Sequence, residues 1–174
     1  MHAPHLVTLH AIGCVHTFGK AVGQHGAAVL TNHEVLITYL VNYCSPIIYS
    51  TSLSLPSIIA IREAYEHMRR CHLERAHLQT LISLFREQAR VLELPSLDSY
   101  TCIQGIIVPT NERVLRVSRD LYQSNMHCFP IRAPTVATGS ERLRIILHAH
   151  NTEGEVYQLC RSLSEAMLTG RIHP

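Results

Sequence analysis

Lysine is nearly absent from this chain: Lys20 stands alone against fourteen arginines. Because lysine is normally among the commonest residues, arginine has taken over the general cationic role here. A neutral amine can attack a carbonyl carbon, whereas a guanidinium group stays charged and cannot. Lys20 follows a threonine and a glycine and precedes small residues, which favours a lysine that bonds a carbonyl carbon. The alternative is compositional drift, with Lys20 an ordinary solvated residue of a loop.

Several other features are missing, and each absence excludes a class of protein. No apolar stretch reaches the length of a membrane span, and residues 1–16 lack the basic start and continuous apolar run of a signal peptide. The formal charge is only +2, with the arginines scattered, which argues against nucleic acid as a partner. We therefore expect a cytoplasmic protein with neither a membrane nor a nucleic-acid partner. Its 174 residues, 47% of them hydrophobic, suit one domain or one domain plus part of another.

The cysteines include no C-x-x-C pair. They are spread almost evenly along the chain, at positions 14, 44, 71, 102, 128 and 160. Isolated cysteines at such spacing predict buried thiols in a reducing compartment.

Thirteen histidines raise the question of a metal site. His148 and His150 would lie on one side of an extended segment, but no cysteine or carboxylate cluster stands nearby to complete a ligand set. His67, His72 and His77 recur every five residues, which does not keep them on one helical face. We therefore expect structural or surface histidines and no metal.

The first third of the chain reads as mixed α/β structure. Residues 14–31 predict a strand, a glycine-rich turn and a second short apolar strand. Thr31 and Asn32 offer an N-cap for a helix over about 33–43, with Leu36, Tyr39 and Leu40 as its apolar face. Pro46 should stop this helix, and residues 47–51 should be extended.

A long helical pattern follows, from Leu55 to about Leu92, and nearly forty residues predict a kink near Cys71 and His72. After Pro95 the pattern alternates between strands (101–108, 128–131, 143–148) and helices (111–124, 151–168). These elements suit a mainly antiparallel sheet with helices on one face. We expect three parts: 1–54 as the end of a larger domain, 55–94 as a linking helix, and 95–174 as a small α+β domain.

Three segments of the chain form a recognisable set: Thr17 to Ala27 (TFGKAVGQHGA), Ile48 to Leu53 (IYSTSL), and Ile131 to Val136 (IRAPTV) with Gly139 to Arg144 (GSERLR). Together they resemble the α-oxoamine synthases, pyridoxal-phosphate enzymes of the aspartate-aminotransferase fold. Three segments in the family's order and spacing are far more specific than one. The resemblance implies an α/β fold of fold-type I: the end of the large cofactor-binding domain, a long linking helix and the small C-terminal domain.

The resemblance also implies roles for the residues around the cofactor. Lys20 corresponds to the catalytic lysine, which binds pyridoxal 5'-phosphate covalently and later acts as the base that removes the Cα proton. Thr17 corresponds to the hydroxyl that contacts the cofactor phosphate; without the family it is simply a β-former at a strand end. Ser50 and Thr51 correspond to residues that reach the phosphate in the partner subunit's site of a homodimer, or are only a polar strand end.

The C-terminal segment resembles the substrate-binding part of the family. Arg132 and Arg144 are candidates for binding a substrate carboxylate, because a planar guanidinium matches two oxygens. Arg142 can instead be a surface ion-pair partner. Thr135 corresponds to the family's substrate-contacting threonine, or is only a turn residue after Pro134.

Within the family, Gly26 to Val29 and Tyr49 to Thr51 are most similar to the branch that joins alanine to a pimeloyl thioester in biotin synthesis. The implied reaction releases carbon dioxide and the carrier thiol. A glycine-using synthase or an aminotransferase of the same fold stays open, as does a non-catalytic remnant that binds a partner through its apolar face.

We expect this chain to be incomplete for catalysis. Family members carry, before the lysine, an aspartate that keeps the cofactor's ring nitrogen protonated, and the only aspartates here are Asp98 and Asp120, both in the small domain. The strands of residues 14–31 would also present open edges and apolar faces without the rest of a large sheet. We therefore expect residues 95–170 to be the most stable part of the chain.

Overall fold

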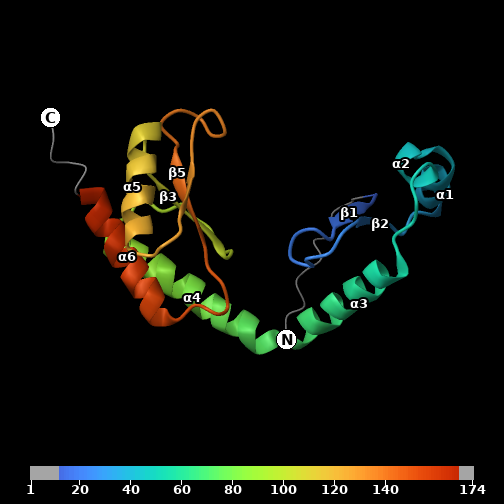
Figure 1. Cartoon of the computed structure of the whole chain (residues 1–174), viewed down its shortest axis with the longest axis horizontal. Coiled ribbons are helices and arrows are strands. Elements are labelled where there is room, and N and C mark those ends of the chain that lie inside the picture. Colours follow the sequence, from blue (N-terminus) through green and yellow to red (C-terminus); the bar gives the residue numbers. More distant parts are fainter. Residues whose placement is uncertain (1–11, 169–174) are drawn as a thin grey trace. The chain divides into compact units, whose positions relative to one another are not determined.

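The computed structural model describes residues 12–168 and consists of two compact units, the first ending at Cys71 and the second beginning at His72 (Figure 1). The first unit contains a two-stranded sheet and three helices: β1 (Cys14–Thr17), β2 (Ala27–Leu30), α1 (Glu34–Tyr43), α2 (Ser45–Ile48) and α3 (Leu55–Arg70). The second contains three helices and three strands: α4 (His72–Val91), β3 (Ile103–Ile107), α5 (Asn111–Gln123), β4 (Phe129–Ile131), β5 (Arg142–Ile146) and α6 (Glu153–Leu168).

Strands β1 and β2 form an antiparallel hairpin, as the sequence predicts. Cys14 is opposite Leu30 and Thr17 is opposite Ala27. Phe18, the residue after β1, is the only buried hydrophobic residue among residues 12–71. The first unit therefore has almost no core of its own among the described residues.

The start of α1 differs from the prediction. His33, rather than Thr31 or Asn32, occupies the N-cap, and its side chain makes no capping hydrogen bond. The Thr31 hydroxyl instead donates to the carbonyl of Ile12 at 2.5 Å and accepts from the backbone N–H of His33 at 3.1 Å. The Thr31 hydroxyl thus links the two ends of the hairpin, and it does not cap the N–H groups of the first turn of α1.

Two further predictions for this region are wrong. Residues 47 and 48, predicted to begin an extended segment over 47–51, belong to the helical turn α2, because a proline in the first turn of a helix loses no hydrogen bond. On α1, Leu36 and Leu40 are half-buried, but Tyr39 is 58% exposed and stacks on the exposed Tyr43. Only part of the predicted apolar face is therefore covered.

The predicted kink in the long helical segment is confirmed as a break at Cys71. Helix α3 begins after Ser54, whose hydroxyl accepts from the N–H of Ser57 at 3.4 Å. Cys71 leaves the helical conformation with ψ of 45°, and α4 starts at the next residue.

The second unit holds a sheet of strand order β3-β5-β4 with both pairs antiparallel, as predicted. Along the central strand β5, Leu143 and Ile145 are buried, whereas Arg144 and Ile146 are exposed. The buried residues join one hydrophobic core with residues of α4, α5 and α6. Because Leu81, Ile82 and Phe85 of α4 belong to this core, the compact unit begins well before Pro95.

All six cysteines are free. Burial raises the pKa of Cys128 to about 11 and that of Cys160 to about 12. The predicted burial is correct for these two and wrong for Cys14, which is exposed on the open hairpin. Within residues 12–168, no helix combines the length and the apolar character that crossing a membrane requires.

Candidate active site

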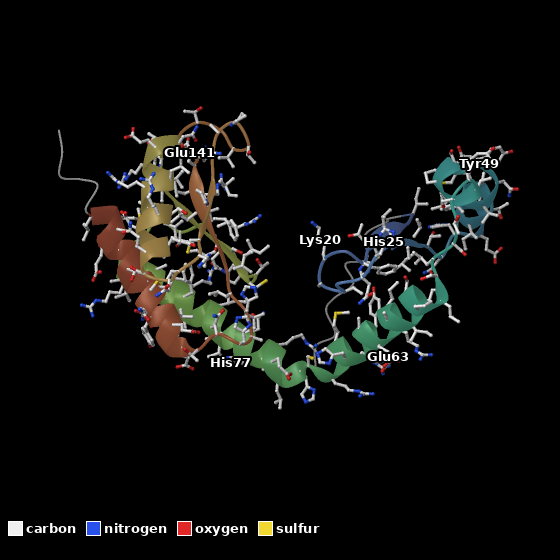
Figure 2. The ribbon with its side chains drawn as sticks, in the orientation of Figure 1. Lys20, His25, Tyr49, Glu63, His77 and Glu141 are labelled. Carbon is white, nitrogen blue, oxygen red and sulfur yellow. The ribbon has the colours of Figure 1, made fainter. Side chains whose placement is uncertain are left out.

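Lys20 lies on the loop that joins β1 to β2 (Figure 2). Backbone hydrogen bonds close this loop: Phe18 donates to Gly26 and Gln24 donates to Phe18, both at 2.9 Å, and Gly23 donates to the carbonyl of Lys20 at 2.9 Å. Gly23 has φ of +66°, in the left-handed region that glycine adopts readily. The loop is therefore held by its own backbone, without help from the lysine side chain.

The Lys20 side chain is exposed and makes no hydrogen bond or ion pair with any residue between 12 and 168. An amine without a protein partner can react with an aldehyde. The lysine present here therefore fits the carbonyl-binding role that the sequence predicts.

Thr17 shares the hairpin with Lys20. It is the last residue of β1 and is exposed, and its hydroxyl has no partner among residues 12–168. A free hydroxyl three residues before the lysine fits a hydrogen bond to a phosphate oxygen.

The segment that carries Ser50 and Thr51 is linked to the hairpin through Leu53. A Cβ atom placed on Gly26 would lie 2.7 Å from Leu53 Cδ2, and Gly26 has φ of +110°. Leu53 therefore packs directly against the backbone of the hairpin at a position that requires glycine. Ser50 and Thr51 are exposed, and the Ser50 hydroxyl donates to the carbonyl of Pro46.

The second unit carries the other candidate residues. Arg132 and Thr135 lie on the loop between β4 and β5, which contains the cis peptide bond Ala133–Pro134. Both side chains are exposed and unpaired with residues 12–168. Arg142 forms no ion pair within that range; its Nε donates to the carbonyl of Ser140 at 3.0 Å, so the alternative of a surface ion-pair partner has no support there.

Arg144 lies on β5, directly opposite Phe129 of β4. Its guanidinium carbon is 5.6 Å from the centre of the Phe129 ring, which is within cation–π range. The side chain is exposed on the sheet face away from the helices. Arg132 and Arg144 are therefore both available to an anionic ligand.

Two residues near this loop have roles that the sequence did not reveal. Asn111, the first residue of α5, exchanges two hydrogen bonds with the backbone of Ala133. Glu141 is 1% exposed and lies beside α5 (Figure 2). Its Oε2 atom accepts from the backbone N–H groups of Thr110 and Gly139 at 3.0 and 2.9 Å.

These hydrogen bonds have an electrostatic consequence. Bonds from its own backbone N–H and from those of Thr110 and Gly139 hold the pKa of the Glu141 carboxyl below its ordinary value, although burial acts in the opposite direction.

The backbone of Thr110 is strained. Its φ of +73° is unusual for a β-branched residue and costs roughly 1–3 kcal/mol.

Both aspartates of the chain lie in the second unit, whereas Lys20 lies in the first. Asp98 pairs with Arg86 at 2.9 Å, and Asp120 lies on α5 in the second unit. For metals, the rings of His148 and His150 stack with centres 5.0 Å apart, but residues 12–168 contain no group of three ligands that could hold an ion. Lys20 and Thr17 therefore carry groups that suit the aldehyde and the phosphate of pyridoxal phosphate, and neither aspartate belongs to the unit that holds them.

The family profile described as "Aminotransferase class I and II" matches residues 3–163. The 8-amino-7-oxononanoate synthase of Pseudomonas entomophila is 40% identical over 149 residues, which cover 86% of this chain and 38% of that protein. The enzyme of the same name from Cellvibrio japonicus is 38% identical over 151 residues, which cover 87% of this chain and 38% of that protein. The chain thus spans about two fifths of the length of these curated relatives.

Solved structures agree with this relationship. The 8-amino-7-oxononanoate synthase of Francisella tularensis superposes with a TM-score of 0.79 at 28% identity, covering 92% of this chain and 47% of that one. Serine palmitoyltransferase from Sphingomonas wittichii has a TM-score of 0.79 at 20% identity, covering 92% of this chain and 40% of that one, and shows the shared fold alone. These matches confirm the fold-type I architecture. The chain therefore belongs to the class I and II aminotransferases, a family of pyridoxal-phosphate-dependent enzymes.

Proposed function

We propose that this chain is the cofactor-lysine and small-domain portion of a pyridoxal-phosphate-dependent acyltransferase that acts as 8-amino-7-oxononanoate synthases do. The observation that carries the proposal is Lys20, the only lysine in the chain, unpaired within residues 12–168 and held on a closed hairpin loop. The 40% identity to a curated synthase supports this branch over the rest of the family.

Around the cofactor, the hairpin supplies the residues that would hold it. Lys20 would bind the aldehyde carbon through Nζ, and the Thr17 hydroxyl would donate a hydrogen bond to the phosphate. Ser50 and Thr51 would reach the phosphate of the second subunit in a homodimer. When bound, pyridoxal phosphate supplies an electron sink for charge that develops on the substrate's Cα atom.

Lys20 would then move a proton. The Nζ atom of Lys20 would accept the Cα proton of the substrate and later return it. Its exposure on the loop, with no acidic partner among the described residues, leaves Nζ free for both steps.

The second unit would bind the substrates. Arg132 and Arg144 would bind a substrate carboxylate through their guanidinium groups, and Thr135 would contact the substrate through its hydroxyl. The proposed substrates are an amino acid, alanine, and an acyl thioester, pimeloyl. The reaction forms a carbon–carbon bond between the amino acid's Cα atom and the acyl carbon, expels the carrier thiol and releases the carboxylate as carbon dioxide.

The ring nitrogen of the cofactor would need a carboxylate, and we propose that neither aspartate of this chain supplies it. Asp98 is engaged with Arg86, and Asp120 belongs to a helix of the second unit. We propose that a further segment, corresponding to the part of the relatives outside the matched region, supplies it, and that the chain alone does not complete the reaction. We place the reaction in the cytoplasm, as the free cysteines favour a reducing compartment.

A second candidate is a non-catalytic module that binds a partner. Helix α1 supports it, because none of its residues is buried and Val35 is 83% exposed. A surface of this kind suits a docking role whether or not the lysine reacts.

One experiment separates the two candidates. The part of the Pseudomonas entomophila enzyme that precedes the matched region would be fused to this chain and supplied with pyridoxal phosphate, L-alanine and pimeloyl-CoA. The proposal predicts carbon dioxide release and a new amino ketone, both lost in Lys20→Ala. Product from glycine but not alanine would indicate a glycine-using synthase. A folded fusion that gives no product with either amino acid would favour the binding module.

A further inference from the structure

We propose that Asn111 and Glu141 are positioning residues that fix the loop 132–140 against the first turn of α5, and thereby place Arg132 and Thr135 for substrate. The inference rests on the proposed substrate role of those two residues. It assigns no direct contact with substrate to Asn111 or Glu141.

Asn111 holds the beginning of the loop. Its Oδ1 atom accepts from the backbone N–H of Ala133 at 3.0 Å, and its Nδ2 atom donates to the carbonyl of the same residue at 3.3 Å. An amide side chain that pairs with both backbone groups of one residue fixes that peptide in position and orientation. Ala133 immediately follows Arg132, so this pair of hydrogen bonds lies next to the residue that is proposed to bind the substrate carboxylate.

Glu141 holds the end of the loop. A single oxygen, Oε2, accepts from the N–H of Gly139 at 2.9 Å and from the N–H of Thr110 at 3.0 Å. The carboxylate therefore joins the last turn of the loop to the residue that caps α5. Thr110 in turn accepts from the N–H of Arg113 through its hydroxyl at 3.2 Å, which anchors this junction on the helix.

Both anchors meet at neighbouring residues, Thr110 and Asn111, so the loop is held near both of its ends by the exposed start of α5. Between the anchors, the backbone bonds internally, with Val136 donating to Arg132 at 3.2 Å and Ser140 donating to Ala137 at 2.9 Å. The side chains of Arg132 and Thr135 make no hydrogen bond with residues 12–168. A fixed backbone with free polar side chains is the arrangement expected of a binding loop on a rigid scaffold.

The test uses the full chain, labelled with ¹⁵N, and two measurements. Hydrogen exchange reports the backbone N–H groups of Ala133 and Gly139, and titration with L-alanine reports the Nε–H signal of Arg132. The variants are Asn111→Ala and Glu141→Ala, with Glu141→Gln as the conservative variant that keeps an oxygen acceptor. Asn111→Asp keeps the acceptor for Ala133 and remains readable if Asn111→Ala fails to fold. Ser118→Ala is the matched control, since it removes a 2.7 Å hydrogen bond to Cys128 within the same unit and outside the loop.

The proposal predicts that exchange at the anchored amide rises about tenfold or more in each alanine variant, while amides of β3 and β5 stay protected. Affinity for L-alanine should fall about tenfold in the same variants and recover in Glu141→Gln, and it should be unchanged in Ser118→Ala. Unchanged exchange at Ala133 and Gly139, or a loosened loop with unchanged affinity, would overturn the proposal. If the unmodified chain does not bind L-alanine, the proposed role of Arg132 is wrong, and the exchange data alone decide whether the two residues fix the loop.

Discussion

The Nδ1 atom of His16 and the hydroxyl of Tyr65 lie 2.8 Å apart, which joins the strand before the lysine loop to helix α3. The two rings also stack, with centres 6.4 Å apart, and the ring of Phe18 meets Tyr65 edge-on at the same separation. Tyr65 thus contacts His16 and Phe18, the two neighbours of Thr17, and supports the hairpin from helix α3.

Tyr65→Phe should loosen the hairpin without unfolding the chain. It removes the hydrogen bond and keeps the aromatic contacts, so the expected loss is about 0.5–1 kcal/mol, the lower part of the range because Tyr65 is 36% exposed. Hydrogen exchange of the β1 and β2 amides measures the effect. His16→Phe should give a similar change, and the double variant should cost no more than one of them, since both remove the same bond. Additive losses would contradict this pairing.

Gly26→Ala should destabilise the hairpin more than Gly23→Ala. Both glycines have positive φ, so alanine at either position carries a conformational cost of about 1–2 kcal/mol. Only Gly26 also faces Leu53, at 2.7 Å from the position of a new Cβ atom, whereas Gly23 faces open space. Adding Leu53→Ala should recover part of the loss in Gly26→Ala. Equal costs at both glycines would show that Leu53 does not pack there.

Glu141→Gln should make the free energy of unfolding of the second unit depend less on pH in the acidic range. Because the pKa of Glu141 is lowered in the folded state, its carboxylate stabilises the fold at pH values above the ordinary value of 4.5, and this contribution disappears as the pH falls through the folded-state pKa. Urea unfolding should therefore show the unmodified chain more stable than Glu141→Gln at pH 7, with the difference shrinking towards pH 3. A difference that grows on acidification would contradict the assigned direction.

Phe85→Ala should unfold much of the second unit, with a cost of about 3–5 kcal/mol. Phe85 is 0% exposed and belongs to the core that α4, α5, α6 and β5 share. Phe18→Ala should cost less, because Phe18 has no other buried hydrophobic residue around it within residues 12–71. Hydrogen exchange followed by mass spectrometry should show the second unit as the more protected one, in line with the stability expected for residues 95–170. Stronger protection in the first unit would contradict that expectation.

The sequence was most informative where local pattern and tertiary structure agree. Apolar periodicity located the hairpin, the long helices and the antiparallel sheet, because each of these elements buries a regular stripe or leaves a regular face open. The three segments of resemblance placed the chain in its family. The pattern correctly ends α1 before Pro46, but it predicts an extended segment from residue 47, where Pro46 instead begins the helical turn α2.

Side-chain partners were harder to anticipate. The sequence predicts Thr31 or Asn32 as the N-cap of α1, but the Thr31 hydroxyl donates instead to the carbonyl of Ile12, nineteen residues away. Asn111 and Glu141 gave no signal beyond a helix start and a charge before a strand, because their partners are backbone groups 22 and 31 residues away. No periodicity reports such contacts, and only the fold brings these residues together.

Covalent labelling of Lys20 tests the central claim most directly. The purified chain would be incubated with pyridoxal phosphate and reduced with borohydride, and the modified residue would be located by mass spectrometry. Lys20 is the only lysine, so the N-terminal amine is the single competing site and Lys20→Ala is the matched control. The account predicts saturable labelling at Lys20, well above that of the denatured chain and weakened by Thr17→Val. Labelling of Lys20 no stronger than in the denatured chain would contradict a cofactor site on this hairpin.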